Sequence, residues 1–295
     1  MPTTIPTTTS TARASLSPST GDAYFETDTK KFIIYDGTDW RGWNNDGIAV
    51  DPSSNTYSVS FDGTDDYLDL GNLGTAGRSL GCLAMWVKIT NGLSSNQSAS
   101  ALFGFGTNSG ANFNGLLWGY WSADTDLFGL VVGTYKTDVN VSTAGDGFGT
   151  GWNHFVLNHN GTGYDIYING TIAYNSTLSG GGTLGLSNYT VNPQSKLTGT
   201  DFDNVKIMRL NHSTGYESQG LVDEIGLWDD ALTSTEISEI YNSGSPISLS
   251  SYSPDGWWRM GDNDGGTGTT ITDQSDNGND GTLTNSPTFS TTVPS

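Results

Sequence analysis

Acidic and amide side chains gather in three stretches of the chain that could bind a metal ion. Calcium takes about six to eight oxygen ligands from carboxylates, amides and loop carbonyls, and acidic turns supply such groups. We therefore predict a calcium site among Asp62, Asp65, Asp66, Asp229, Asp230, Asp273, Ser275 and Asn277. The alternative at each stretch is an Asx turn, in which a short carboxylate accepts hydrogen bonds from nearby backbone.

The third stretch, residues 273–278, matches the first half of an EF-hand loop. Thr284 stands at the twelfth position, where an EF-hand has a glutamate that binds the ion through both oxygens. The stretch is therefore not an EF-hand.

Three aromatic residues could form a platform for a sugar ring: Trp118, Tyr120 and Trp121. In a strand, successive side chains point to opposite faces, so Trp118 and Tyr120 would share one face and Trp121 would lie on the other. The same rings could instead belong to the hydrophobic core, which is the more common role of such residues, and the sequence leaves both interpretations open.

Residues for hydrolysis are not arranged in a recognisable way. Cleaving a glycosidic bond takes two carboxylates that flank it. No alternating pair on one strand occurs among the glutamates, which are Glu26, Glu217, Glu224, Glu236 and Glu239. We therefore predict that the protein is not an enzyme.

The histidines and the cysteine do not suggest catalysis either. His154, His159 and His212 lack metal-ligand spacing. Cys82 lies in an apolar run, which is typical of a buried small hydrophobic residue.

The composition favours short strands and many turns. The chain has 295 residues with 40 glycines, and its formal net charge is −20. Nucleic-acid binding needs clustered cations, and only 11 lysines and arginines are spread over the chain. We therefore expect neither nucleic acid nor an anionic membrane as a partner, although the charge could also serve solubility alone.

The first 50 residues differ in character from the rest. Residues 1–20 are rich in Thr and Pro and predict an extended arm. Residues 21–50 predict a small β-hairpin module, with strands at 23–27 and 31–35. No secretory signal or long apolar run is recognisable, so we expect a protein that is made in the cytoplasm and that reaches any site outside the cell by another route.

The remainder, residues 51–295, predicts one domain of many short strands. A helix is predicted near residues 233–241, where Thr233 and Glu236 have the spacing of a capping box.

Three stretches of this domain, residues 60–68, 151–170 and 221–233, together resemble the laminin-G-like/concanavalin A-like lectin family. The resemblance covers roughly residues 57–243. It implies an all-β fold, an antiparallel two-sheet jelly-roll sandwich, often with calcium at one edge.

The C-terminal segment departs from the order of that family. Residues 252–290 contain motifs that usually precede the strand at residues 60–62. We predict that this segment completes the sandwich in permuted order. A partial second repeat is the alternative, but it would leave Trp257, Trp258 and Phe289 without a core to join.

The hairpin string GDAYFETDTKKFIIYDGTDW, residues 21–40, is similar to a module that recurs in bacteriophage virion proteins. The resemblance implies a virion structural protein, a capsid decoration or a fibre or tail component, which displays the jelly roll for host-surface attachment. Its partners would be other virion proteins, further copies in a trimer, and a host glycan. The residues predicted to mediate assembly are Tyr24, Phe25, Phe32, Ile34, Tyr35 and Trp40.

Two other functions remain open. The protein could be a carbohydrate-binding adhesin whose main role is to bind a glycan, or, as a third hypothesis, a glycoside hydrolase.

Overall fold

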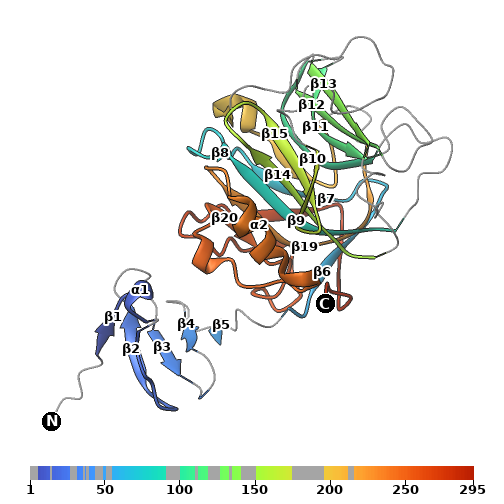
Figure 1. The fold of residues 1–295 in the computed structure, drawn as a ribbon. Helices are drawn as coiled ribbons and strands as arrows, with labels where there is room; N and C mark the ends of the chain where they lie inside the picture. The colour runs from blue at the N-terminus through green and yellow to red at the C-terminus, as the bar shows by residue number, and fades with distance from the viewer. Residues whose placement is uncertain are drawn as a thin grey trace. The chain divides into compact units, whose positions relative to one another are not determined.

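The structure is a computed structural model, and the chain divides into two compact units, residues 1–54 and 55–295 (Figure 1). It describes residues 6–13, 15–26, 32–35, 37, 40–43, 49–50, 55–90, 100–109, 112–118, 127–132, 135–140, 151–174, 196–211 and 216–295.

The first unit contains a five-stranded sheet in the order β1-β2-β3-β4-β5. Its elements are β1 (Thr7–Thr8), α1 (Ser10–Arg13), β2 (Ala23–Glu26), β3 (Phe32–Tyr35), β4 (Trp40–Trp43) and β5 (Ala49–Val50). The predicted hairpin corresponds to β2 and β3, which pair antiparallel.

This sheet is larger than the sequence suggested. Within the predicted extended arm, β1 pairs in parallel with β2, and α1 follows it. On the other side, β4 pairs with β3. A lone hairpin is marginally stable in water, and these added strands supply the backbone partners that it lacks.

The second unit is built from two large antiparallel sheets. The β7 sheet has the order β13-β12-β11-β10-β18-β7-β22-β21. Its strands are β7 (Tyr67–Gly71), β10 (Ser100–Ser109), β11 (Asn112–Trp118), β12 (Leu127–Val132), β13 (Tyr135–Asn140), β18 (Val205–Ile207), β21 (Thr270–Ile271) and β22 (Gly281–Thr284).

The β9 sheet has the order β16-β15-β14-β9-β19-β6-β23, and β20 also pairs with β19. Its strands are β6 (Ser58–Asp62), β9 (Cys82–Ile89), β14 (Asn153–His159), β15 (Tyr164–Ile168), β16 (Thr171–Tyr174), β19 (Gln219–Trp228), β20 (Gly256–Trp258) and β23 (Thr288–Ser290). A short pair joins β8 (Ser79–Leu80) to β17 (Leu197–Thr198). The predicted all-β antiparallel sandwich is confirmed.

One hydrophobic cluster lies between the two sheets. The β7 sheet contributes Leu68 and Phe103, the β9 sheet contributes Met85 and Phe155, and all four side chains are fully buried. Burying each such side chain stabilises the fold by roughly 1.5–3 kcal/mol, so this cluster is the main source of stability.

A second cluster covers the outer face of the β9 sheet, where α2 (Ser234–Tyr241) packs through Ile237 and Ile240. The predicted capping box is present: Glu236 N–H donates to Thr233 Oγ1 over 3.2 Å, and Thr233 N–H donates to Glu236 Oε2 over 2.7 Å. The helix ends at Asn242, whose left-handed conformation (φ 44°) closes the last turn.

The C-terminal strands belong to both sheets. β22 pairs with β7, β23 with β6 and β20 with β19, all antiparallel. Trp258 is fully buried in the main cluster, and Phe289 packs against it. The segment therefore contributes strands to both sheets, and its completion of the sandwich in permuted order stays a prediction.

Candidate functional site

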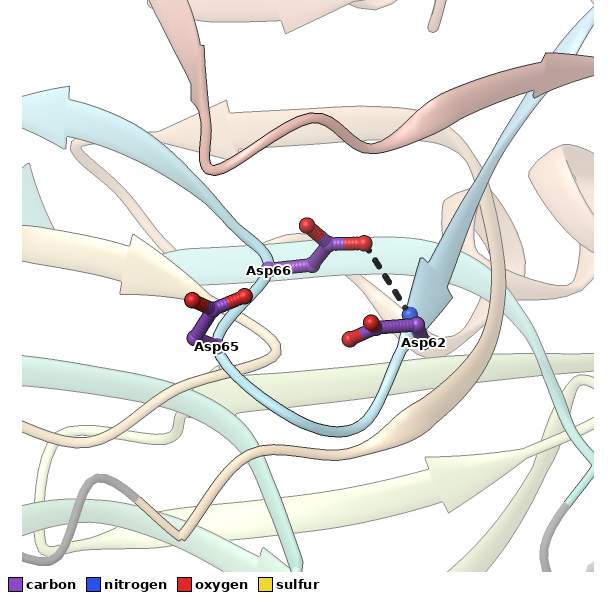
Figure 2. Close-up of side chains that lie close together, drawn as sticks. All are labelled: Asp62, Asp65 and Asp66. Atoms are coloured by element: carbon purple, nitrogen blue, oxygen red, sulfur yellow. Dashed lines mark hydrogen bonds between the residues drawn. The ribbon is translucent and has the colours of Figure 1, made fainter.

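The turn between β6 and β7 brings together three of the predicted metal ligands, Asp62, Asp65 and Asp66 (Figure 2). Asp62 Oδ1 accepts from Thr64 N–H over 2.7 Å, and Asp66 Oδ2 accepts from Asp62 N–H over 3.2 Å. These bonds fold the turn so that one oxygen from each carboxylate lies within 4.8 Å of the others.

The electrostatics of this turn favour a cation. Asp62 and Asp65 are exposed, whereas Asp66 is buried. Burial raises the pKa of Asp66, and the nearby carboxylates of Asp62 and Asp65 raise it further, although the bond from Asp62 N–H opposes them. A divalent ion would neutralise this repulsion.

The donor set of the turn fits calcium. Each oxygen of a carboxylate can ligate, and the described residues donate no hydrogen bond to Asp62 Oδ2, to Asp66 Oδ1 or to either oxygen of Asp65. Backbone carbonyls or water would have to complete a shell of about six to eight oxygens.

Asp229 and Asp230 are instead paired with cations. Asp229 lies 3.2 Å from Arg78 Nη1 and accepts from Ser79 N–H over 2.9 Å. Asp230 lies 2.7 Å from Lys196 Nζ. The protein itself thus supplies the positive charge that a metal would bring.

Asp273 is occupied by protein donors as well. Its Oδ1 accepts from Trp257 N–H and Ser275 N–H, each over 2.9 Å. Its Oδ2 accepts from Ser275 Oγ over 2.8 Å and from Asn279 N–H over 2.9 Å, while Asn277 Nδ2 donates to the Asp255 carbonyl over 3.0 Å. The structure thus favours the Asx-turn alternative here. The loop at residues 273–279 is hydrogen-bonded to β20 and to the residue that precedes it.

The predicted sugar platform lies almost wholly beyond what the structure describes. Trp118 is the last residue of β11, and only its backbone is described, while Tyr120 and Trp121 fall outside the described residues. A sugar site at these rings stays a prediction.

A shallow, open groove that the sequence did not indicate runs between α2 and the turn from β15 to β16, with a volume of about 870 Å³. Its lining is rich in hydroxyl groups, from Thr171, Ser234, Thr235, Ser238 and Ser243. The Ser/Thr spacing of α2 is visible in the sequence, but nothing local shows that the Asn169-Gly170 turn lies opposite the helix.

Two tyrosines and a carboxylate complete the groove. Tyr252 Oη donates to Glu239 Oε2 over 3.1 Å. The Tyr241 ring is stacked on Trp86 of β9 and on His154 of β14, with ring centroids 5.9 and 6.2 Å apart. The groove wall is thus fixed to the β9 sheet.

A separate group of charged residues is buried near β19 and β20. Arg259 Nε donates to Glu224 Oε1 over 2.8 Å, and Trp257 Nε1 donates to Glu224 Oε2 over 2.7 Å. Asp262 lies 3.3 Å from Arg259 Nη2. Burial raises the pKa of Glu224, and the Arg259 guanidinium opposes that shift. Since Glu224 is only 4% exposed, it cannot reach a substrate, and we interpret the group as structural.

Comparison with protein families adds the decisive observation. A model described as the concanavalin A-like lectin/glucanases superfamily matches residues 62–238. The chain belongs to this superfamily. The match spans β7 through most of α2 and therefore most of both sheets. Since the superfamily includes both lectins and glucanases, membership alone does not separate binding from hydrolysis.

Solved structures agree with this fold. A Bacteroides ovatus protein assigned as carbohydrate-binding is 16% identical, with a TM-score of 0.52, covering 94% of this chain and 72% of its own. Looser similarity is found to the CBM40 of Ruminococcus gnavus IT-sialidase (14% identity, 62% and 96% coverage, TM-score 0.41). It is also found to a SAP-like pentraxin from Limulus polyphemus (15% identity, 65% and 84% coverage, TM-score 0.42).

No curated protein sequence matches the chain. In the described part of the chain, no helix has the length and apolar character needed to cross a membrane.

Proposed function

We propose that the protein is a non-catalytic, carbohydrate-binding attachment protein whose jelly roll binds a glycan while its N-terminal unit joins a phage virion. The observation that carries the glycan-binding part is the superfamily match over residues 62–238. A groove lined by hydroxyl groups on the same domain supports it.

The non-catalytic part rests on where three of the described glutamates lie. A glycosidase needs two carboxylates on opposite sides of a bond in an open site. Glu224 is buried against Arg259, Glu236 caps α2, and Glu239 accepts a bond from Tyr252. These engagements favour binding over hydrolysis.

The virion part rests on the first unit. It forms a compact body of its own, and residues 21–40 resemble a module of phage virion proteins. Phe25 of β2 is 36% exposed, and Tyr24, Ile34 and Tyr35 are half-buried. We propose that these side chains contact other virion proteins or further copies in a trimer, as a capsid decoration or a fibre or tail component.

A glycan array tests the function. The full chain would be applied with calcium and, separately, with EDTA. We expect the chain to be retained on a similar subset of glycans under both conditions. The retained glycans should be recovered intact. Retention on no glycan under either condition would refute carbohydrate binding, and shortened glycans in the eluate would refute the non-catalytic part.

A further inference from the structure

We propose that the groove between α2 and the β15–β16 turn is the glycan site, and that it takes neutral rather than acidic saccharides. This inference rests on the proposed function, because it assigns a location and a ligand class to the same binding activity.

Unengaged hydroxyl groups are the first reason. In the described residues, the hydroxyls of Thr171, Ser234, Thr235, Ser238 and Ser243 make no hydrogen bond, although each can both donate and accept. Sugar hydroxyls have the same dual character. A volume of about 870 Å³ lies within the range of roughly 300–1,000 Å³ typical of small-ligand sites.

The charge of the groove gives the ligand class. Among the described residues that line it, none is a lysine, arginine or histidine, and the one ionisable carboxylate is Glu239. An acidic sugar would therefore meet a like charge without a cation to bind it, on a chain whose formal net charge is −20. A neutral saccharide meets hydroxyl, amide and phenol groups, and its own hydroxyls can donate to the Glu239 carboxylate without charge repulsion.

The walls of the groove are held in place by contacts within the chain. Its helix wall is held by the capping box, and Tyr241 is stacked on Trp86 and His154. At the opposite wall Gly170 adopts φ +75°, and a Cβ there would lie 2.9 Å from Tyr241 Cδ1, so the absence of a side chain permits this contact. Preformed walls reduce the ordering cost of binding.

His154 provides a reporter beneath the groove. It is 1% exposed, and its Nδ1 has no hydrogen-bond partner among the described residues. Burial lowers its pKa to about 3, so the ring stays neutral at physiological pH. The chain has three histidines, which keeps a histidine NMR spectrum simple.

The test titrates the full chain with lactose, maltotriose, xylotriose, mannotriose and sialyllactose, and records both binding heat and histidine ring resonances. We expect at least one neutral sugar to bind and to shift the His154 resonance, because Tyr241 stacks on that ring, while His159 stays unchanged. Sialyllactose should bind at least about tenfold more weakly than the best neutral sugar.

Variants locate the site. Ser238→Tyr places a large side chain in the groove, and Thr282→Tyr, at the exposed position of β22, is its matched control. Tyr252→Phe removes one phenol hydroxyl, and Tyr67→Phe is the control for it. We expect both groove variants to weaken binding, Ser238→Tyr by about tenfold or more, and both controls to bind as the parent does.

The outcomes separate the two proposals. If glycans bind but Ser238→Tyr and Tyr252→Phe bind like the parent and His154 does not shift, the groove is not the site and only this inference fails. A preference for sialyllactose would overturn the ligand class. If no sugar binds in this titration and none binds on the array, both the inference and the proposed function are overturned.

Discussion

Asp223 of β19 is a carboxylate that folding buries without full compensation. It is fully buried; its Oδ1 accepts from Glu224 N–H over 2.9 Å, but its Oδ2 has no partner among the described residues. Burial, and then the neighbouring Glu224 carboxylate, raise the pKa of Asp223 well above the ordinary range, although the nearby Asn55 side chain and the bond from Glu224 N–H oppose this shift. The folded chain therefore holds this proton to a higher pH than the unfolded chain does.

The consequence for stability has a definite sign. Below the unfolded pKa of about 3.9, both states are protonated, and stability is lost as the pH rises toward the folded pKa. We predict that Asp223→Asn raises the free energy of unfolding at pH 7.5 by roughly 1–3 kcal/mol, because the amide keeps the acceptor without the charge.

Urea denaturation of both proteins at pH 4 and pH 7.5 measures this effect. The variant's advantage should be larger at pH 7.5, whereas the exposed control Asp276→Asn should follow the parent at both values. If the variant is less stable than the parent at pH 7.5, Asp223 is charged in the folded protein and neighbouring groups compensate for the burial of its charge.

Asp62, Asp65 and Asp66 carry the calcium prediction. A ligand that binds only the folded state stabilises it by about 2.7 kcal/mol at a concentration of a hundred times its Kd. We predict that millimolar calcium raises the melting temperature over that in EDTA, and that Asp65→Asn removes most of this shift. Asp230→Asn, at an exposed ion pair with Lys196, is the control. An equal melting temperature with and without calcium would rule the site out.

At the residue scale, the sequence predicted which side chains could bind a metal better than it predicted the hydrogen-bond and ion-pair partners of those side chains. The predicted grouping of Asp62, Asp65 and Asp66 holds, because all three lie in one short turn. Asp229 and Asp273 could not be judged in the same way, since Arg78 and Trp257, which satisfy them, come from other elements. The orphaned oxygen of Asp223 was equally invisible, because it depends on what surrounds β19.

Among the elements, α2 links the fold to the groove. Thr233 is the N-cap of the helix, and its hydroxyl accepts from Glu236 N–H, so its replacement by alanine would leave that N–H without an acceptor. We predict that Thr233→Ala lowers the free energy of unfolding by about 1 kcal/mol and weakens saccharide binding.

Thermal unfolding and calorimetric titration measure the two effects. Ser238→Ala, on the same helix but away from the cap, should leave stability unchanged or slightly raised. If Thr233→Ala were as stable as Ser238→Ala, the cap would contribute nothing to the groove wall.

Local signals also explain which elements could be predicted. The capping box made α2 visible, and the motif at residues 60–68 made β6 and β7 visible. The additions to the hairpin were not, since the pairing of Thr7 and Thr8 with β2 is parallel and non-local. The role of residues 252–290 was inferred from motifs of the family and from large apolar side chains, and Trp258 does lie in the core.

At the scale of the molecule, we propose that each unit has one function: the second unit binds the glycan and the first joins the virion. Residues 55–295 contain both sheets and both hydrophobic clusters, and residues 1–54 form their own sheet. We predict that a chain lacking residues 1–54 folds and binds saccharide with the parent's affinity but is not incorporated into phage particles.

Immunoblots of purified particles and titration of the shortened chain would check this. As a control, the substitution Ser238→Tyr in the full chain should spare incorporation while it weakens binding. Unchanged incorporation of the shortened chain would contradict the anchoring role of the first unit.

The overall architecture followed from the sequence because three motifs of the superfamily occur in order and the strands alternate. The groove did not, since it is formed by α2 and the β15–β16 turn, which are separated by more than sixty residues, from Asn169 to Ser234. No local sequence pattern indicates that the helix and the turn lie close together.

The most direct test of the central claim, binding without catalysis, is calorimetric titration of the full chain with the neutral oligosaccharide that the array retains best. The ligand would then be recovered and analysed by mass spectrometry after prolonged incubation. We predict saturable heat for one site per chain and a ligand of unchanged mass. Absence of binding heat, or recovery of cleaved sugar, would contradict the claim.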